Sequence, residues 1–385
     1  MKKSLIAAPA LVGAMALAFA GCAQAPGTEP GASTAPSSAA ASGSASASGS
    51  ASAGGSASAG GAAFKACMVS DSGGFDDKSF NQTSYKGLTD AKTQLGIETG
   101  QVESTTPSDF AKNIQSMVDA KCNLVVTVGF ALGDNTLAAA KKNPNVKFAI
   151  VDNNDPKYAG VKNLKPLVYN TAESSFLAGY LAAGMSTTKK VGTFGGAKYP
   201  TVTIFMDGFA QGVEHYNKQK NASVQVLGWN NDRQDGQFIP SGNFDDIQGG
   251  QRTAQGLISQ GADVILPVAG PAGQGALQAA KASGGKVKAM WVDTDGCVSA
   301  PTYCPQIVTS VYKAMDVSVT AAIKAAQDGS FSNEAYVGTL KNQGTGISPY
   351  HEFDAKIPAE LKAEVEKVKA DIESGTLKVT SKSAP

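Results

Sequence analysis

Arginine is almost absent from this chain of 385 residues, which contains only Arg233 and Arg252. The formal net charge is +1, and no basic stripe is present, so a nucleic-acid partner is not expected. A phosphorylated ligand is also disfavoured, because phosphate groups are commonly held by the paired N–H donors of arginine. The composition therefore favours an uncharged ligand.

The chain is equally poor in residues that would indicate catalysis or metal binding. His215 and His351 have no suitable partner nearby in sequence, and we expect both at the surface or in loops. No cysteine pair has CxxC spacing, so we expect no metal. The glycine-rich segment 270–275 lacks the endings of phosphate and dinucleotide motifs, and no nucleophile elbow occurs, so we expect neither a cofactor nor an enzyme.

No apolar run is long enough for a confident membrane span. Lys2 and Lys3 precede a short apolar run, 5–20, which is typical of a secretion signal. Small residues before Cys22 resemble the lipobox of bacterial lipoproteins, although Phe19 replaces the usual leucine. We therefore expect a signal peptide over 1–21, lipid on Cys22, and anchoring at the extracytoplasmic face of the cell membrane; the alternative is ordinary cleavage near Ala20.

Residues 22–63 consist almost entirely of alanine, serine, glycine, threonine and proline. Such a segment cannot bury enough apolar surface to fold, and we expect a disordered tether. The folded part would then lie near the membrane through its lipid anchor.

Strand and helix patterns alternate after residue 64, which predicts parallel sheets with right-handed crossovers. The length favours two lobes. We expect an α/β fold with two Rossmann-like lobes, a periplasmic-binding-protein type I architecture with three hinge crossings near 168–170, 297–310 and 336–340. The predicted lobes comprise 64–168 plus about 305–335, and 169–304 plus about 336–385.

Four cysteines remain after Cys22, and an oxidising location permits disulfides. Cys297 and Cys304 flank a short loop and are expected to pair. Cys67 and Cys122 each begin a predicted strand, and those two strands are neighbours in a doubly wound sheet, so a second bridge is plausible.

The most informative motif is D-S-G-G-F-D-D-K-S-F-N-Q, which runs from Asp71 to Gln82 after a short apolar strand. Ser79 and Gln82 have capping-box spacing, which predicts a helix from Ser79. Asp71 then ends a strand, and Phe80 and Asn81 lie in the next helix's first turn, at the sheet edge where ligands bind. Alternatively, Asp71 caps a turn and Phe80 is core.

Further polar or glycine residues follow other predicted strands. Asp152, Gly270 and Asp293 each follow a hydrophobic strand, and Lys313 closes the segment T-S-V-Y-K. Trp229 and Trp291 also end strands, where we expect them to pack. Because carboxyl ends of parallel strands share one edge, these residues are candidates for one binding site.

These motifs, with E-S-S-F-L-A-G-Y-L-A-A from Glu173, D-G-F-A-Q-G from Asp207 and A-G-P-A-G-Q-G from Ala269, resemble the basic-membrane-protein family. Its members are PnrA-like nucleoside-binding lipoproteins of ABC importers. The resemblance implies a purine nucleoside ligand (guanosine, inosine or adenosine type) and an ABC permease partner, and we expect the protein to be a monomer. It places base-stacking rings at Phe80 and Phe244, and polar contacts at Asp71, Asn81, Asp152, Gly270, Asp293 and Lys313.

The chemistry of these residues supports that reading. Two aromatic rings can sandwich a purine, and carboxylates can accept hydrogen bonds from both ribose hydroxyls. Two stacking rings also bind sugars, so a receptor for a sugar or another small signal molecule is an alternative. A nucleoside-processing enzyme and a surface adhesin are further alternatives.

Overall fold

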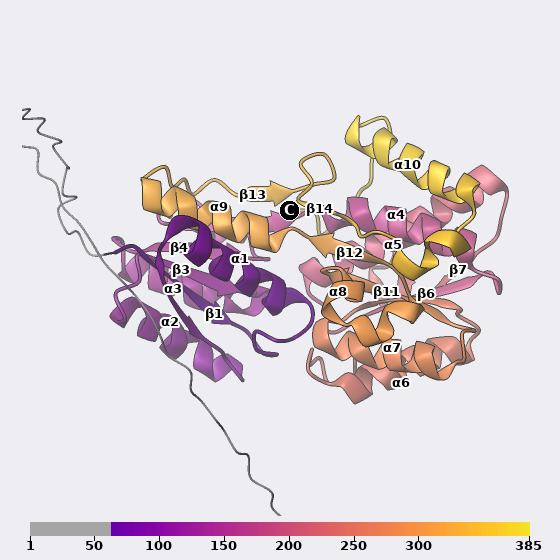
Figure 1. The fold of residues 1–385 in the computed structure, drawn as a ribbon, viewed down its shortest axis with the longest axis horizontal. Helices are drawn as coiled ribbons and strands as arrows, with labels where there is room; N and C mark the ends of the chain where they lie inside the picture. The colour runs from indigo at the N-terminus through magenta and orange to yellow at the C-terminus, as the bar shows by residue number, and fades with distance from the viewer. Residues whose placement is uncertain (1–62) are drawn as a thin grey trace, which may run out of the picture. The chain divides into compact units, whose positions relative to one another are not determined.

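The computed structural model describes residues 63–385, which form two lobes, each built on a six-stranded sheet (Figure 1). The predicted signal peptide, Cys22 and nearly all of the tether lie outside the described residues. None of the helices in this part of the chain is long and apolar enough to cross a membrane.

The sheet of the N-terminal lobe has the strand order β13-β5-β4-β3-β1-β2, and all neighbours are parallel. Its strands are β1 (Lys65–Ser70), β2 (Glu98–Val102), β3 (Leu124–Val128), β4 (Lys147–Val151), β5 (Leu164–Tyr169) and β13 (Tyr336–Gly338). The four central strands consist almost entirely of buried residues, as expected for a parallel sheet covered on both faces.

Four helices cover this sheet, two on each face. The apolar sides of α1 (Phe80–Leu95) and α9 (Met315–Asp328) share one hydrophobic core, and those of α2 (Phe110–Asp119) and α3 (Gly133–Lys142) share the other. Figure 1 shows α9, drawn in orange, beside the indigo helix α1, although more than 200 residues separate them. The segment 315–338, which contains α9 and β13, therefore completes the N-terminal lobe.

The sheet of the C-terminal lobe has the order β14-β12-β11-β10-β6-β7. Only β14 runs antiparallel to its neighbour. Its strands are β6 (Lys190–Gly195), β7 (Gln225–Leu227), β10 (Val264–Val268), β11 (Lys288–Asp293), β12 (Ile307–Lys313) and β14 (Thr345–Ile347). A short hairpin of β8 (Trp229–Asn230) and β9 (Asp235–Gly236) lies beyond β7 in the chain.

Five longer helices cover the second sheet. One face carries α4 (Thr171–Met185), α5 (Pro200–Lys220) and α10 (Ala359–Glu373), and the other carries α6 (Ile247–Ser259) and α7 (Gln274–Ala282). Short helical turns occur in the loops at α8 (Gly296–Ser299), η1 (Pro107–Asp109), η2 (Phe130–Leu132), η3 (Pro156–Tyr158), η4 (Gly270–Gly273), η5 (Pro301–Gln306) and η6 (His351–Lys356).

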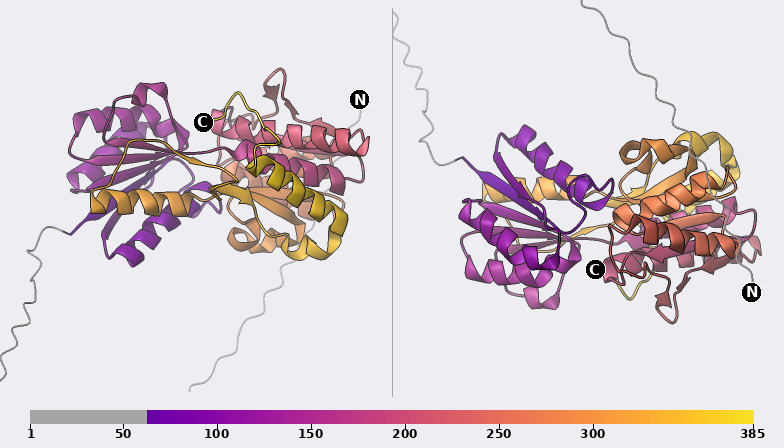
Figure 2. Two further views of the ribbon diagram at one scale, coloured as in Figure 1. Left: turned by 90° about the horizontal axis from the view of Figure 1, so that it is seen from above. Right: turned by 90° about the horizontal axis from the view of Figure 1, so that it is seen from below.

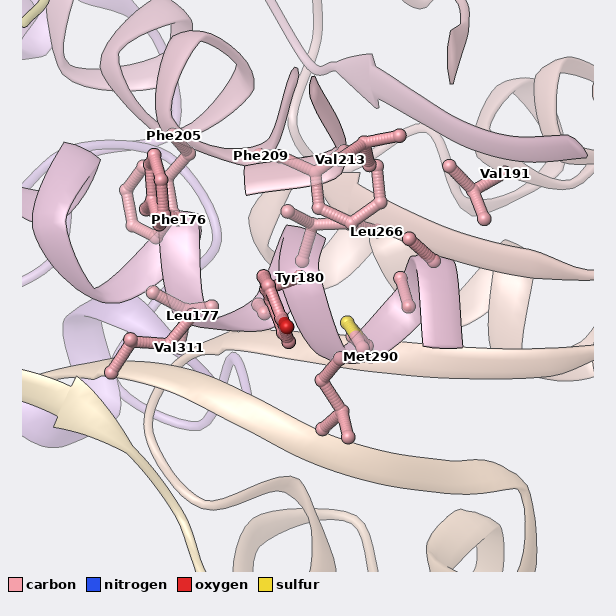
Figure 3. Packing of buried hydrophobic residues seen from close by; sticks show 14 of the residues in the cluster. Phe176, Leu177, Tyr180, Val191, Phe205, Phe209, Val213, Leu266, Met290 and Val311 are labelled. Carbon is pink, nitrogen blue, oxygen red and sulfur yellow. The ribbon is translucent and has the colours of Figure 1, made fainter. Parts of the chain in front are cut away.

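Helices α4 and α5 approach one another unusually closely. A Cβ atom on Gly179 would lie 2.0 Å from the carbonyl oxygen of Phe209, and one on Gly212 would lie 2.0 Å from that of Phe176. Large side chains of the same two helices, namely Phe176, Tyr180, Phe205 and Phe209, pack in one core with residues of the sheet such as Met290 (Figure 3). This packing accounts for the near-complete burial of α4, which the sequence shows only as an apolar helix.

The predicted fold class is confirmed, but the predicted lobe boundaries need two corrections. The segment 305–313, assigned to the N-terminal lobe, forms β12 of the second sheet, and β13, assigned to the C-terminal lobe, pairs with β5 of the first. The middle crossing therefore lies at Lys313 and Ala314, between β12 and α9, rather than within 297–310. Figure 2 shows these late segments passing between the lobes.

Both expected cysteine pairs are disulfides in the structure. Cys67 on β1 is joined to Cys122, just before β3, with Cα atoms 5.9 Å apart. Cys297 is joined to Cys304 across α8 and η5, with Cα atoms 4.5 Å apart. The first bridge links neighbouring strands at the end of the sheet remote from Asp71, and the second holds a surface loop.

Trp229 and Trp291 are buried, as expected for packing residues. Their indole N–H groups donate to Asp207 Oδ1 at 3.0 Å and to the carbonyl oxygen of Lys78 at 3.1 Å, respectively. Trp291 therefore also connects the second sheet to the turn that precedes α1.

Candidate functional site

A cavity lined by residues of both lobes lies at the carboxyl ends of their strands. This is the sheet edge at which α/β folds bind small molecules. All the ligand-binding candidates from the sequence line it: Asp71, Phe80, Asn81, Asp152, Phe244, Gly270, Asp293 and Lys313. The structure therefore brings together residues from both lobes that lie up to about 240 positions apart in sequence.

The turn before α1 is organised by Asp77, which the sequence analysis did not single out. Its buried carboxylate accepts hydrogen bonds from the backbone N–H groups of Ser79 at 2.9 Å, Asn81 at 2.9 Å and Gln82 at 3.0 Å. The helix begins one residue later than predicted, at Phe80, and the expected Ser79 side-chain cap is not formed. Asp77 satisfies N–H groups that the helix leaves free, and so fixes Phe80 and Asn81.

Ser79 instead points toward the other lobe. Its hydroxyl group donates to Asp293 Oδ2 at 2.9 Å and lies 3.2 Å from the carbonyl oxygen of Val292. The residue that sequence spacing suggested as a cap thus forms a direct contact between the lobes.

Within the cavity, Asp71 and Asn81 form a pair. The side-chain amide of Asn81 donates to Asp71 Oδ1 at 2.9 Å and to the carbonyl oxygen of Ser72 at 3.1 Å. Gly129 allows this arrangement, because a Cβ atom there would lie 2.1 Å from Asp71 Oδ2, and its φ is +121°. Burial raises the pKa of Asp71 to about 8, and the nearby carboxylates of Asp77, Asp245 and Asp152 add to the effect.

Lys313, which also lines the cavity, links carboxylates from both lobes. Its ammonium group lies 2.5 Å from Asp152 Oδ2 and 3.3 Å from Asp293 Oδ1, and the residue is only 4% exposed. Burial opposes the charge on Lys313, but the two carboxylates outweigh it and raise its pKa, so the ammonium stays charged. The charge also lies 5.0 Å from the ring centroid of Phe80 and 5.1 Å from that of Phe205.

Two buried acceptor atoms in the cavity make no hydrogen bond within residues 63–385, namely Asn81 Oδ1 and Asp152 Oδ1. Buried polar atoms normally have partners, so these two are suited to donors on a ligand. Asp152 and Asp293 also have left-handed backbone conformations, with φ of +66° and +71°. Such strain in residues with side chains is typical of functional sites.

The cavity contains more aromatic residues than the sequence analysis proposed. Phe130, Tyr199 and Phe205 line it in addition to Phe80 and Phe244. Phe130 follows Gly129 at a strand end, which the sequence shows, whereas Tyr199 precedes the proline that begins α5 and gave no signal of a site. Phe244 packs against Gly196, where a Cβ atom would lie only 2.5 Å from its ring, so glycine is needed there to make room.

The two histidines, for which the sequence indicates no functional role, lie outside the cavity. His351 is exposed and its Nε2 atom lies 2.7 Å from Asp295 Oδ2, while His215 is partly exposed on α5 and contacts Gln219. Neither residue lines the cavity.

Residues 64–381 match the family model described as ABC transporter substrate-binding protein PnrA-like. The chain belongs to this family. It is 30% identical over 317 residues to basic membrane protein A of Borreliella burgdorferi, covering 80% of this chain and 85% of the relative. It is 28% identical to the ABC transporter nucleoside-binding protein BmpA of Lactococcus lactis, covering 83% and 89%.

The fold has close neighbours among solved structures. An ABC transporter solute-binding protein from Aeropyrum pernix superposes with a TM-score of 0.72 at 23% identity, covering 82% of this chain and 92% of that one. A second from Conexibacter woesei gives a TM-score of 0.64 at 22% identity, over 83% and 99%. The chain is thus a substrate-binding protein of an ABC transporter rather than an enzyme, as the sequence analysis predicted.

Proposed function

We propose that this substrate-binding protein captures purine nucleosides of the guanosine, inosine or adenosine type between its lobes and delivers them to an ABC permease. The observation that carries the proposal is the convergence of all the predicted contacts on one interlobe cavity. The nucleoside-binding name of the Lactococcus lactis relative supports the same ligand class.

Two groups of cavity residues suit the two halves of a nucleoside. Asp152, Asp293 and Lys313 provide charged acceptors and a donor, which match the hydroxyl groups of ribose. Asp71 and Asn81 form a less charged pair, where a carboxyl group and an amide can bind the edge of a base. Phe80 adjoins both groups, because it precedes Asn81 and its ring centroid lies 5.0 Å from the Lys313 ammonium; each ring stacked on a base contributes about 1–3 kcal/mol.

Native mass spectrometry of protein purified without refolding tests this proposal, because a co-purified ligand identifies itself by mass. Calorimetry with guanosine, inosine, adenosine and free ribose then ranks the ligands. We expect tight binding of at least one nucleoside and much weaker binding of ribose. Equal affinity for ribose would favour a sugar receptor, and binding of neither would exclude the proposal.

We further propose that a lipid on Cys22 holds the protein at the extracytoplasmic face of the cell membrane, and that it acts as a monomer. Mass spectrometry of the amino-terminal peptide from membranes should reveal a diacylglycerol-modified cysteine, and Cys22→Ala should release the protein. A free amino terminus near residue 21 would indicate an ordinary signal peptide. Light scattering measures the oligomeric state.

A further inference from the structure

Two aromatic residues make a contact between the lobes that the proposed ligand set does not use. Phe130 belongs to the N-terminal lobe, at the start of η2 after β3, and Tyr199 belongs to the C-terminal lobe, directly before α5. Their ring centroids are 5.0 Å apart, with 31° between the ring planes. Tyr199 also stacks on Phe244, with centroids 6.0 Å apart and 29° between the planes.

The position of Phe130 makes this contact a wall of the cavity. Phe130, like Asp152 and Thr201, lines both the ligand cavity and a second cavity formed by residues of both lobes and the last residues of the chain, so it lies between the two spaces. On another side of the ligand cavity, Ser79 and the carbonyl group of Lys78 contact Asp293 and Trp291. The cavity is therefore bounded by polar contacts between the lobes, which include Lys313 with Asp152, and by the aromatic contact of Phe130 with Tyr199.

We propose that Phe130 and Tyr199 form an aromatic gate, which closes the cavity when the lobes come together and slows the escape of the ligand. The identity of that ligand rests on the proposed function. Because the rings belong to different lobes, their contact is lost whenever the lobes separate, so it stabilises only the closed state. Within the C-terminal lobe, Tyr199 also stacks on Phe244, a predicted stacking ring.

This location predicts a kinetic effect. The open protein admits a ligand whether or not the gate residues are present, so association changes little. Dissociation requires opening, and the loss of an aromatic pair should accelerate it by about three- to tenfold. A residue that only supports the fold would instead lower thermal stability without this selective change in dissociation.

Stopped-flow measurement of guanosine dissociation from the full folded chain tests the gate. Phe130→Ala and Tyr199→Ala should each speed dissociation about three- to tenfold, and the double variant should be no faster than the faster single one. Tyr199→Phe should dissociate as slowly as the wild type, because the ring of Tyr199 rather than its hydroxyl group contacts Phe130. Tyr303→Ala, an aromatic change within the Cys297–Cys304 loop, controls for general effects. Unchanged dissociation, or independent multiplicative effects, would overturn the gate.

A second measurement does not depend on the ligand. Fluorescent labels at Lys141 and Lys286, exposed positions on the two lobes, report the closed fraction by energy transfer in ligand-free protein. Tyr199→Ala should lower that fraction, and an unchanged fraction would also count against the gate. If the wild type binds no nucleoside, the proposed function fails, and this measurement still decides whether Phe130 and Tyr199 hold the lobes together.

Discussion

The buried carboxyl group of Asp71 should make the stability of this protein depend on pH. Its pKa is near 3.8 in a solvated chain and rises to about 8 in the cavity. The folded state therefore binds more protons than the unfolded state between about pH 4 and 8, and its free energy of unfolding falls as pH rises through that window. At about 1.4 kcal/mol for each pH unit, the loss between pH 5 and 8 is about 3–4 kcal/mol.

The substitution Asp71→Asn removes this penalty while keeping the shape of the side chain. The new amide oxygen can still accept the hydrogen bond from Asn81 that Asp71 Oδ1 now accepts. We expect the variant to be more stable than the wild type at pH 8, and its advantage to grow by about 3 kcal/mol from pH 5 to pH 8. Guanidinium denaturation of ligand-free protein at pH 5, 6, 7 and 8 measures the difference.

The control is Asp76→Asn, which removes a charge from the same turn at a side chain that is 82% exposed. Exposed ion pairs contribute little to stability, so this variant should show no comparable gain at high pH. A difference between Asp71→Asn and wild type that stays constant with pH, within the error of the extrapolation, would refute the argument that burial governs this carboxyl group.

Three further changes test other parts of the molecule. Asp293→Ala should weaken nucleoside binding by about 1.5–3 kcal/mol, because a charged acceptor is lost, and unchanged affinity in calorimetry would remove it from the site. Asp77→Ala should lower the free energy of unfolding by about 1–2 kcal/mol in denaturant melts, because three backbone N–H groups lose their acceptor; an unaltered midpoint would contradict that capping role. Replacing both Cys67 and Cys122 by serine should cost about 3–4 kcal/mol in the same assay, since the bridge spans 55 residues; equal stability would argue that the unfolded chain gains little freedom.

The sequence was sufficient for the fold class and for placing the candidate site residues around one cavity. Most of them lie at strand ends or in the connections that follow, and Phe80 and Asn81 lie in the first turn of α1. The alternation of strands and helices places such positions at one edge of a sheet. The pattern therefore places Asp71 and Asp152 at the ligand-binding edge of the first sheet, and Asp293 at the corresponding edge of the second. Their roles in binding remain predictions.

Features that depend on contacts between distant segments could not be predicted in the same way. The apolar pattern of β12 identifies a buried strand but does not say which sheet it joins, and β13 has only three residues to indicate its pairing with β5. Asp77 precedes the helix by three positions, so a search for S-x-x-Q spacing selected Ser79 instead. The contact between Phe130 and Tyr199 exists only because two lobes meet.

The repeated topology of the lobes explains why a lysine and two carboxylates meet at the crossing between them. The strand order β2-β1-β3-β4-β5 in the first sheet matches β7-β6-β10-β11-β12 in the second. Asp152 directly follows β4, Asp293 ends the equivalent strand β11, and both have positive φ. Lys313 ends β12, immediately before the chain crosses to α9, and contacts both carboxylates.

Equivalent positions in the two lobes thus supply matching acceptors that face a single cation at the hinge. Separation of the lobes would move Asp152 away from Asp293 and would leave Lys313 with one partner. A ligand whose adjacent hydroxyl groups bind both carboxylates would therefore be held fully only in the closed form, which couples its recognition to closure. By the same geometry, we expect a ligand with only one hydroxyl group to close the lobes less than a ligand whose two hydroxyl groups bind both carboxylates.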